Sequence, residues 1–81
     1  MKNYLTEQDV IDMFGDNLLK MLEYKRMTAA ELSRACGLER STISRYLSKE
    51  RMPSMRALIN ICYVLDCNYE ELLPTYTLVV L

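Results

Sequence analysis

The sequence predicts an all-α domain of five helices followed by an extended apolar segment. Apolar residues recur at three- and four-residue spacing over most of the chain, and capping residues stand before several of these stretches. The stretch TYTLVVL differs, because it is rich in β-branched and aromatic residues and is typical of a strand. With 81 residues, the chain is expected to form one domain with a modest core.

The first helical stretch follows Thr6, which with Asp9 forms a capping pattern, while residues 1–5 are predicted to be a short arm. Apolar residues stand on both sides of Gly15. Because glycine costs a helix about 1 kcal/mol relative to alanine, two structures remain open. The stretch forms either one long helix with a weak point at Gly15, or a short helix followed by the main first helix.

The second helix is predicted over residues 29–36, where Thr28 and Glu31 form another capping box. Gly37 stands where a left-handed residue commonly ends a helix. A third helix is predicted from about residue 41 to 47 or 48. The residues expected on the buried sides of these two helices are Leu32, Ala35, Cys36, Ile43, Tyr46 and Leu47. The third helix then turns a polar and basic side outward, with Arg40, Ser41, Ser44 and Arg45.

A fourth helix is predicted over residues 55–66, after Pro53 and the cap residue Ser54. It is expected to bury Leu58, Ile61, Cys62 and Leu65 and to carry further apolar residues on a second side, Ile59, Tyr63 and Val64. Asn68 and Glu71 predict a short fifth helix that packs Leu72 and Leu73 inward and ends before Pro74.

Composition argues against catalysis and against a metal centre. The chain has no histidine, its three cysteines do not form a Cys-x-x-Cys pair, and its two glycines form no phosphate-binding loop. Buried thiols acting as small apolar side chains explain the cysteines best, and no cofactor is expected. No apolar run approaches the roughly 18 residues that a membrane-spanning helix needs. No signal peptide is evident either, so a cytoplasmic location is expected.

Charge is distributed unevenly along the chain. Residues 20–56 hold nine of the ten lysines and arginines against four glutamates, whereas the remaining residues are acidic. A local basic surface of this kind attracts a polyanion within about 10 Å. Two helices joined by a short turn that contains glycine, the second with an exposed basic side, are also the pattern of a helix-turn-helix motif.

Residues 14–73 resemble the five-helix, lambda-repressor-like DNA-binding domain of Cro/C1-type (XRE) regulators. The resemblance depends on a combination of motifs: FGDNL in the first helix, T-x-x-E-L opening the second, G-L in the turn, STISRYL as the recognition helix, R-x-P-S in the next loop, and NYEELL near the end. It implies a division into an arm and short helix at 1–13, the DNA-binding domain at 14–73, and an extended tail at 74–81.

The resemblance also implies roles for individual residues. Arg40 and Ser41 would contact base edges in the major groove of double-stranded DNA, and Ser44 and Arg45, one turn later, would contact bases or flanking phosphates. Contacts to backbone phosphates are expected from Thr28, Thr42, Lys49 and Arg51. A glutamine that often binds phosphate at the start of the second helix is here Ala29, so that contact is lost or moves to Thr28.

Two further positions depart from the family pattern. The arginine and glutamate that many members pair in the interior are here Leu22 and Leu47. Replacing both partners by apolar residues removes the cost of desolvating a buried ion pair. The glycine that usually follows the recognition helix is Lys49, so that helix is expected to run on or to end less sharply.

Three classes of function remain at this point. The leading hypothesis is a sequence-specific transcriptional regulator, a repressor or Cro-like protein, that binds a palindromic operator as a homodimer. The alternative is a protein-interaction module, or an antitoxin, that uses the same fold to bind a partner protein. An enzyme is the third class, and no residue pattern supports it. The apolar tail would either pair across the twofold axis of the dimer or fold back on its own domain.

Overall fold

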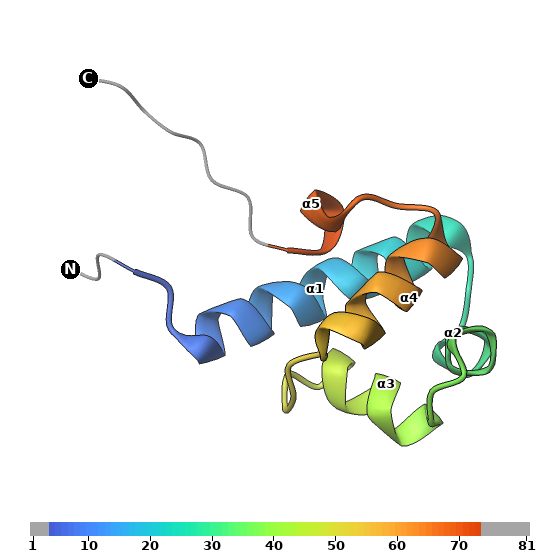
Figure 1. Cartoon of the computed structure of the whole chain (residues 1–81), viewed down its shortest axis with the longest axis horizontal. Helices are drawn as coiled ribbons and strands as arrows, with labels where there is room; N and C mark the ends of the chain where they lie inside the picture. The colour runs from blue at the N-terminus through green and yellow to red at the C-terminus, as the bar shows by residue number, and fades with distance from the viewer. Residues whose placement is uncertain (1–3, 74–81) are drawn as a thin grey trace.

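The computed structural model describes residues 4–73 and contains five helices and no strand within that range (Figure 1). The predicted all-α helix-turn-helix fold is confirmed. The expected strand over the tail lies outside the described residues. The helices are α1 (Glu7–Lys25), α2 (Ala29–Cys36), α3 (Arg40–Leu47), α4 (Met55–Leu65) and α5 (Tyr69–Leu72).

The predicted caps begin the helices. The Thr6 hydroxyl accepts a hydrogen bond from the Asp9 N–H at 3.1 Å, and the Asp9 carboxylate accepts one from the Thr6 N–H at 2.9 Å. At α4, the Ser54 hydroxyl accepts from the Ala57 N–H at 3.1 Å. These bonds satisfy N–H groups that have no partner within their own helix, so the local sequence fixes where these helices start.

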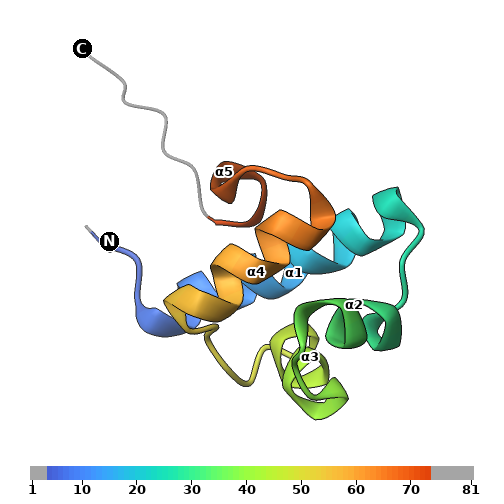
Figure 2. The ribbon, with the colours of Figure 1, turned by 45° about the vertical axis from the view of Figure 1, so that its right-hand side comes forward.

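The five helices share one core: α1 packs on α3, α4 and α5, whereas α2 packs on α3 and α4. Figure 2 shows α4 lying across α1 with α2 and α3 side by side below them. Phe14 and Tyr46 meet edge to face in this core, with ring centroids 5.6 Å apart. An edge-to-face pair adds to the stability that burial alone provides. The side chains with no more than 1% of their surface exposed are Phe14, Leu18, Leu32, Ile43, Ile61, Leu65 and Leu72.

Gly15 lies inside a continuous α1, so the first of the two open structures is correct. Its backbone is buried, and the end of α3 packs directly on it: a methyl group added at Gly15 would lie 2.8 Å from the Tyr46 carbonyl oxygen. Only a residue without a side chain allows this approach of α3 to α1. The absence of a side chain at Gly15 therefore allows the C-terminal end of α3 to pack closely on α1.

Substituting Gly15→Ala is expected to destabilise the domain, although alanine favours a helix by about 1 kcal/mol. The added methyl group must displace the backbone of α3, and overpacking of this kind costs about 1–3 kcal/mol. Urea unfolding of the variant measures the difference. Lys20→Ala is the matched control, because Lys20 is an exposed residue of the same helix. A Gly15→Ala variant more stable than the wild type would show that α3 adjusts without cost.

Two expectations about the helices are wrong. Ala35 is exposed rather than buried, and Ser33 takes the buried place in α2 with 4% of its surface exposed. The end of α3 is sharp despite the absence of glycine, since Lys49 itself adopts a left-handed conformation with φ of 64°. Among residues 4–73, no helix is long and apolar enough to cross a membrane.

Candidate nucleic-acid interface

Helices α2 and α3 pack against each other through a short turn. Gly37 ends α2 in the left-handed conformation, with φ of 68°, and the Leu38 N–H then donates to the Ser33 carbonyl at 2.9 Å. The Ser33 hydroxyl donates to the Ala30 carbonyl at 2.8 Å, so this buried polar side chain is satisfied. The glycine and the small serine together allow the close crossing of the two helices.

One side of α3 is fixed in the core and the other faces solvent. Ile43 and Tyr46 are almost completely buried, with 0% and 2% of their surface exposed. Figures 1 and 2 both place α3 at the edge of the molecule, beside α2. The four residues proposed to contact bases lie together on the solvent side and are all exposed: Arg40, Ser41, Ser44 and Arg45.

The arginines of this exposed side are available to a ligand. Within residues 4–73, the guanidinium groups of Arg40 and Arg45 form no hydrogen bond or ion pair with the rest of the chain. Ser41 makes only a long hydrogen bond to the Glu39 carboxylate, at 3.4 Å. The chain therefore leaves most of the hydrogen-bonding capacity of this side to an external partner.

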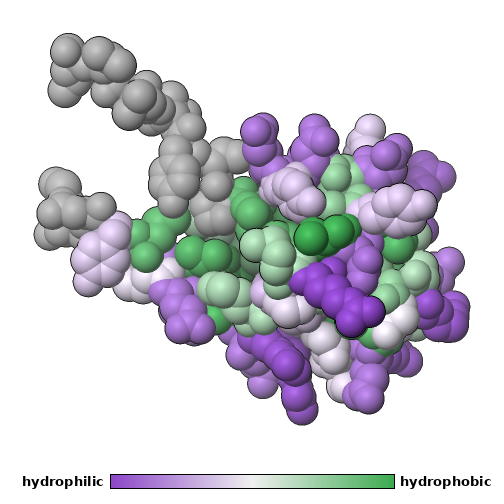
Figure 3. Space-filling model, in the orientation of Figure 1, coloured by the Kyte–Doolittle hydropathy of each residue, from purple (hydrophilic) through white to green (hydrophobic). Residues whose placement is uncertain are grey.

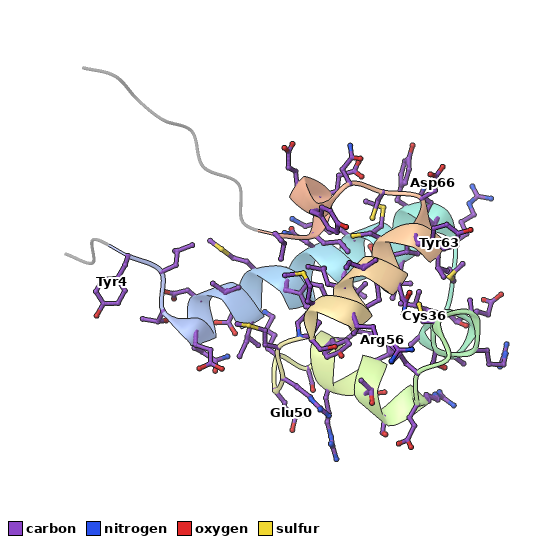
Figure 4. All side chains as sticks on the ribbon, viewed as in Figure 1. Tyr4, Cys36, Glu50, Arg56, Tyr63 and Asp66 are labelled. Carbon is purple, nitrogen blue, oxygen red and sulfur yellow. The ribbon has the colours of Figure 1, made fainter. Side chains whose placement is uncertain are left out.

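Exposed cations also surround the ends of α3. Arg51 follows α3, and Arg56 lines a small hollow with Gly37 and Leu38 of the turn. Figure 4 shows Arg56 beside the start of α4, and Figure 3 shows hydrophilic surface along the edge of the molecule where α3 lies. Arg56 was counted in the basic segment of the sequence but was given no role. Arg56 lies beside the turn only because α4 packs near it in the folded domain, and no local sequence pattern predicts that packing.

Two of the four proposed phosphate contacts are already engaged within the chain. The Thr28 hydroxyl accepts from the Glu31 N–H at 3.1 Å, and the Thr28 N–H donates to the Glu31 carboxylate at 3.0 Å. The hydrogen bond that the Thr28 N–H donates to the carboxylate lowers the pKa of Glu31, which is exposed. A carboxylate therefore occupies the start of α2, where a phosphate would otherwise be attracted.

Lys49 is engaged as well. Its ammonium nitrogen lies 2.8 Å from an Asp16 carboxylate oxygen, and this contact raises the pKa of Lys49. Its N–H donates to the Tyr46 carbonyl at 3.2 Å, and the Glu50 N–H donates to the Arg45 carbonyl at 2.9 Å. This pair of bonds is the Schellman pattern, which ends a helix sharply. The ion pair and the two bonds hold a non-glycine residue in its left-handed conformation.

The other two proposed phosphate contacts differ in their exposure. Thr42 is half-buried in the first turn of α3, and Arg51 is exposed in the following loop. Among residues 4–73, no three cysteine, aspartate or glutamate side chains gather where they could hold a metal ion. The exposed side of α3 is thus a polar surface whose arginines have no partner in the described part of the chain.

These features define a helix-turn-helix domain with an exposed, basic second helix. A family model for the Cro/C1-type HTH DNA-binding domain matches residues 17–77. The chain belongs to this family. It is also 33% identical over 61 residues to YqaE of Bacillus subtilis (strain 168), an uncharacterized HTH-type transcriptional regulator. That match covers 75% of this chain and 53% of YqaE, so the chain spans about half the length of this relative.

Solved structures share the fold at lower identity. The restriction-modification controller protein C.AhdI from Aeromonas hydrophila superposes with a TM-score of 0.72 at 24% identity, over 76% of this chain and 94% of that one. The SOS-response transcriptional repressor LexA from Eubacterium rectale gives a TM-score of 0.76 at 17% identity, over 94% of this chain and 79% of that one. At these identities the two likenesses show a shared fold.

Proposed function

We propose that the chain is a sequence-specific DNA-binding transcriptional regulator that places α3 in the major groove. The observation that carries this proposal is the side of α3 with two unpaired arginines and two exposed serines, set on a helix that Ile43 and Tyr46 hold rigidly. The major groove is about 12 Å wide and admits one helix. A guanidinium group matches the two acceptors of guanine, and hydroxyls suit either bases or phosphates.

Phosphate contacts around α3 would position it in the groove. The residues proposed for this role are Thr42 in the first turn of α3, Lys49 and Arg51 after it, and Thr28 at the start of α2. Because Lys49 is paired with Asp16, Arg51 is expected to contribute more to the salt dependence of binding than Lys49. Each phosphate that a cation neutralises steepens the fall of affinity with salt.

We also propose that the protein binds a palindromic operator as a homodimer. An exposed apolar surface on α4 supports this proposal: Ile59 is 44% exposed and Tyr63 is 86% exposed. Figure 3 shows apolar surface across the middle of the face turned to the viewer. Exposed apolar surface of this kind commonly marks a protein interface. A twofold axis would set two copies of α3 about 34 Å apart, at successive turns of DNA.

The same α4 surface also supports the alternative, in which the fold binds a different protein as an interaction module or antitoxin. Binding to random duplex DNA at two salt concentrations separates the two functions. DNA binding that weakens steeply with salt supports the regulator. If binding to random duplexes stays undetectable at low salt, the interaction module is favoured. Selection of bound sequences from a random pool would then identify the operator.

Arg40→Ala is expected to weaken operator binding by about 1–3 kcal/mol and to relax the preference at one base pair in each half-site. Arg45→Ala should do the same if Arg45 contacts a base. If Arg45 contacts only phosphate, the variant should weaken binding to all sequences equally and reduce the salt dependence. Repeating the selection with each variant distinguishes these results. Lys20→Ala is the control, because it removes an exposed cation of α1 that lines a hollow with residues of α5. An unchanged preference for Arg40→Ala would exclude a base contact by that residue.

A further inference from the structure

The end of α4 brings two cysteines together. Asp66 ends the helix in a left-handed conformation, with φ of 50°, and the Cys67 N–H donates to the Cys62 carbonyl at 3.0 Å. In this type of helix end, the side chains at these two positions commonly pack on each other. Here both side chains are thiols, and they are close enough that each affects the pKa of the other.

The pair lies in the wall of an open hollow. Cys62 is buried and Cys67 is half-buried. Both line a hollow of about 370 Å³ together with Ile59, Tyr63 and Tyr69. Burial, together with the smaller effects of the neighbouring Cys62 and Glu71, raises the pKa of Cys67 to about 12. Both thiols are therefore neutral at physiological pH, in surroundings that disfavour charge.

We propose that Cys62 and Cys67 form a modification site at which a small-molecule disulfide oxidises the two thiols to an intramolecular disulfide. Cys67, the more accessible of the two, attacks one sulfur of the small disulfide and displaces the first small thiol. The Cys62 sulfur then attacks the Cys67 sulfur, forms the Cys62–Cys67 bond and releases the second small thiol. Two electrons pass from the protein to the small disulfide, and the two protein protons leave on the two released thiols.

The closeness of the two thiols and the apolar character of their surroundings both favour the Cys62–Cys67 disulfide. The second attack occurs between sulfurs that are already neighbours, so it competes well with further reaction in solution. The disulfide is neutral and suits an apolar wall. The raised pKa of Cys67 slows the first attack, because the thiolate is the nucleophile. The raised pKa therefore affects the rate of the reaction, and a measurement made at equilibrium is the appropriate test of the product.

The test equilibrates the full chain, at dilute protein concentration, in buffers with graded ratios of oxidised to reduced glutathione. Mass spectrometry of the intact chain and of its peptides should show the loss of two hydrogens and a cross-link between residues 62 and 67. The cross-link should form at an oxidised-to-reduced ratio about tenfold lower than the ratio that adds glutathione to Cys36. Cys36 is a suitable internal standard, because it is a half-buried thiol in α2 that lines a different hollow.

Two variants complete the experiment. Cys36→Ser should leave the cross-link unchanged, and Cys67→Ser should abolish it while circular dichroism shows a folded helical domain. The proposal is overturned by a stable glutathione adduct on Cys67, by disulfides that join Cys36 or two chains, or by thiols that stay reduced where Cys36 is modified. Because the hollow belongs to the α4 surface proposed for dimerisation, the dilute protein concentration favours the monomer, in which this surface is open to the small disulfide.

Discussion

Leu22→Arg is expected to lower the free energy of unfolding by about 3–5 kcal/mol, the cost of an unpaired charge in a protein interior. Leu22 is 4% exposed and belongs to the core. The resemblance to the family implies an arginine paired with a glutamate at this position in many members, and Leu22→Arg alone would lack that partner. A domain of 81 residues has a total stability of about 4–12 kcal/mol. The variant should therefore lose a large share of its stability, from about a quarter of it to all of it.

Adding Leu47→Glu to this variant is expected to recover part of the loss. Leu47 is half-buried and packs against the core from the end of α3. Because the family resemblance implies that positions 22 and 47 pair in many members, we predict that they are in contact here, which would let the two charges pair. Urea unfolding of the wild type, both single variants and the double variant gives the coupling energy. Leu19→Arg is the control, because Leu19 is 48% exposed on the same helix. A double variant no more stable than Leu22→Arg alone would refute the contact.

The helices could be predicted because their signals are local. Thr6, Thr28 and Ser54 begin helices where the sequence indicated, and Gly37 ends α2 in the predicted conformation. Caps and apolar spacing act within a few residues, so one sequence is enough to detect them. The exposed side of α3 followed from the same spacing, once Ile43 and Tyr46 were assigned to the core.

The remaining features depend on residues far apart in the sequence. Gly15 was interpreted as a weak point of a helix, whereas its role is to accept the α3 backbone. Ala35 was expected to be buried, but the contact of α2 with its neighbours centres on Leu32 and Ser33 instead. Lys49 was assigned to phosphate without its ion pair to Asp16, which lies 33 positions earlier. Each of these three features depends on how the helices pack against one another, and residue spacing along a single helix does not predict that packing.

Deleting residues 76–81 is expected to yield a monomer that keeps its helical content and binds a two-site operator about 100- to 10,000-fold more weakly. The range is the usual gain when two binding units are linked. The deleted stretch ends with Leu78, Val79, Val80 and Leu81, four apolar residues in a row. A small domain has little core to cover them, whereas the exposed apolar side of α4 in a second copy offers such a surface.

The deletion has three outcomes, and analytical ultracentrifugation with circular dichroism separates them. A folded monomer supports dimerisation through residues 76–81. A truncated chain that still sediments as a dimer would place the interface elsewhere, and an unfolded one would assign these residues to the core of their own domain.

Tyr63→Arg in the full chain tests the α4 side of the same interface and should also yield a monomer. Tyr24→Arg is its matched control, because Tyr24 is 79% exposed, close to the 86% of Tyr63, but lies at the end of α1. Equal loss of dimer in both variants would mean that charge alone, rather than the α4 surface, disrupts the assembly.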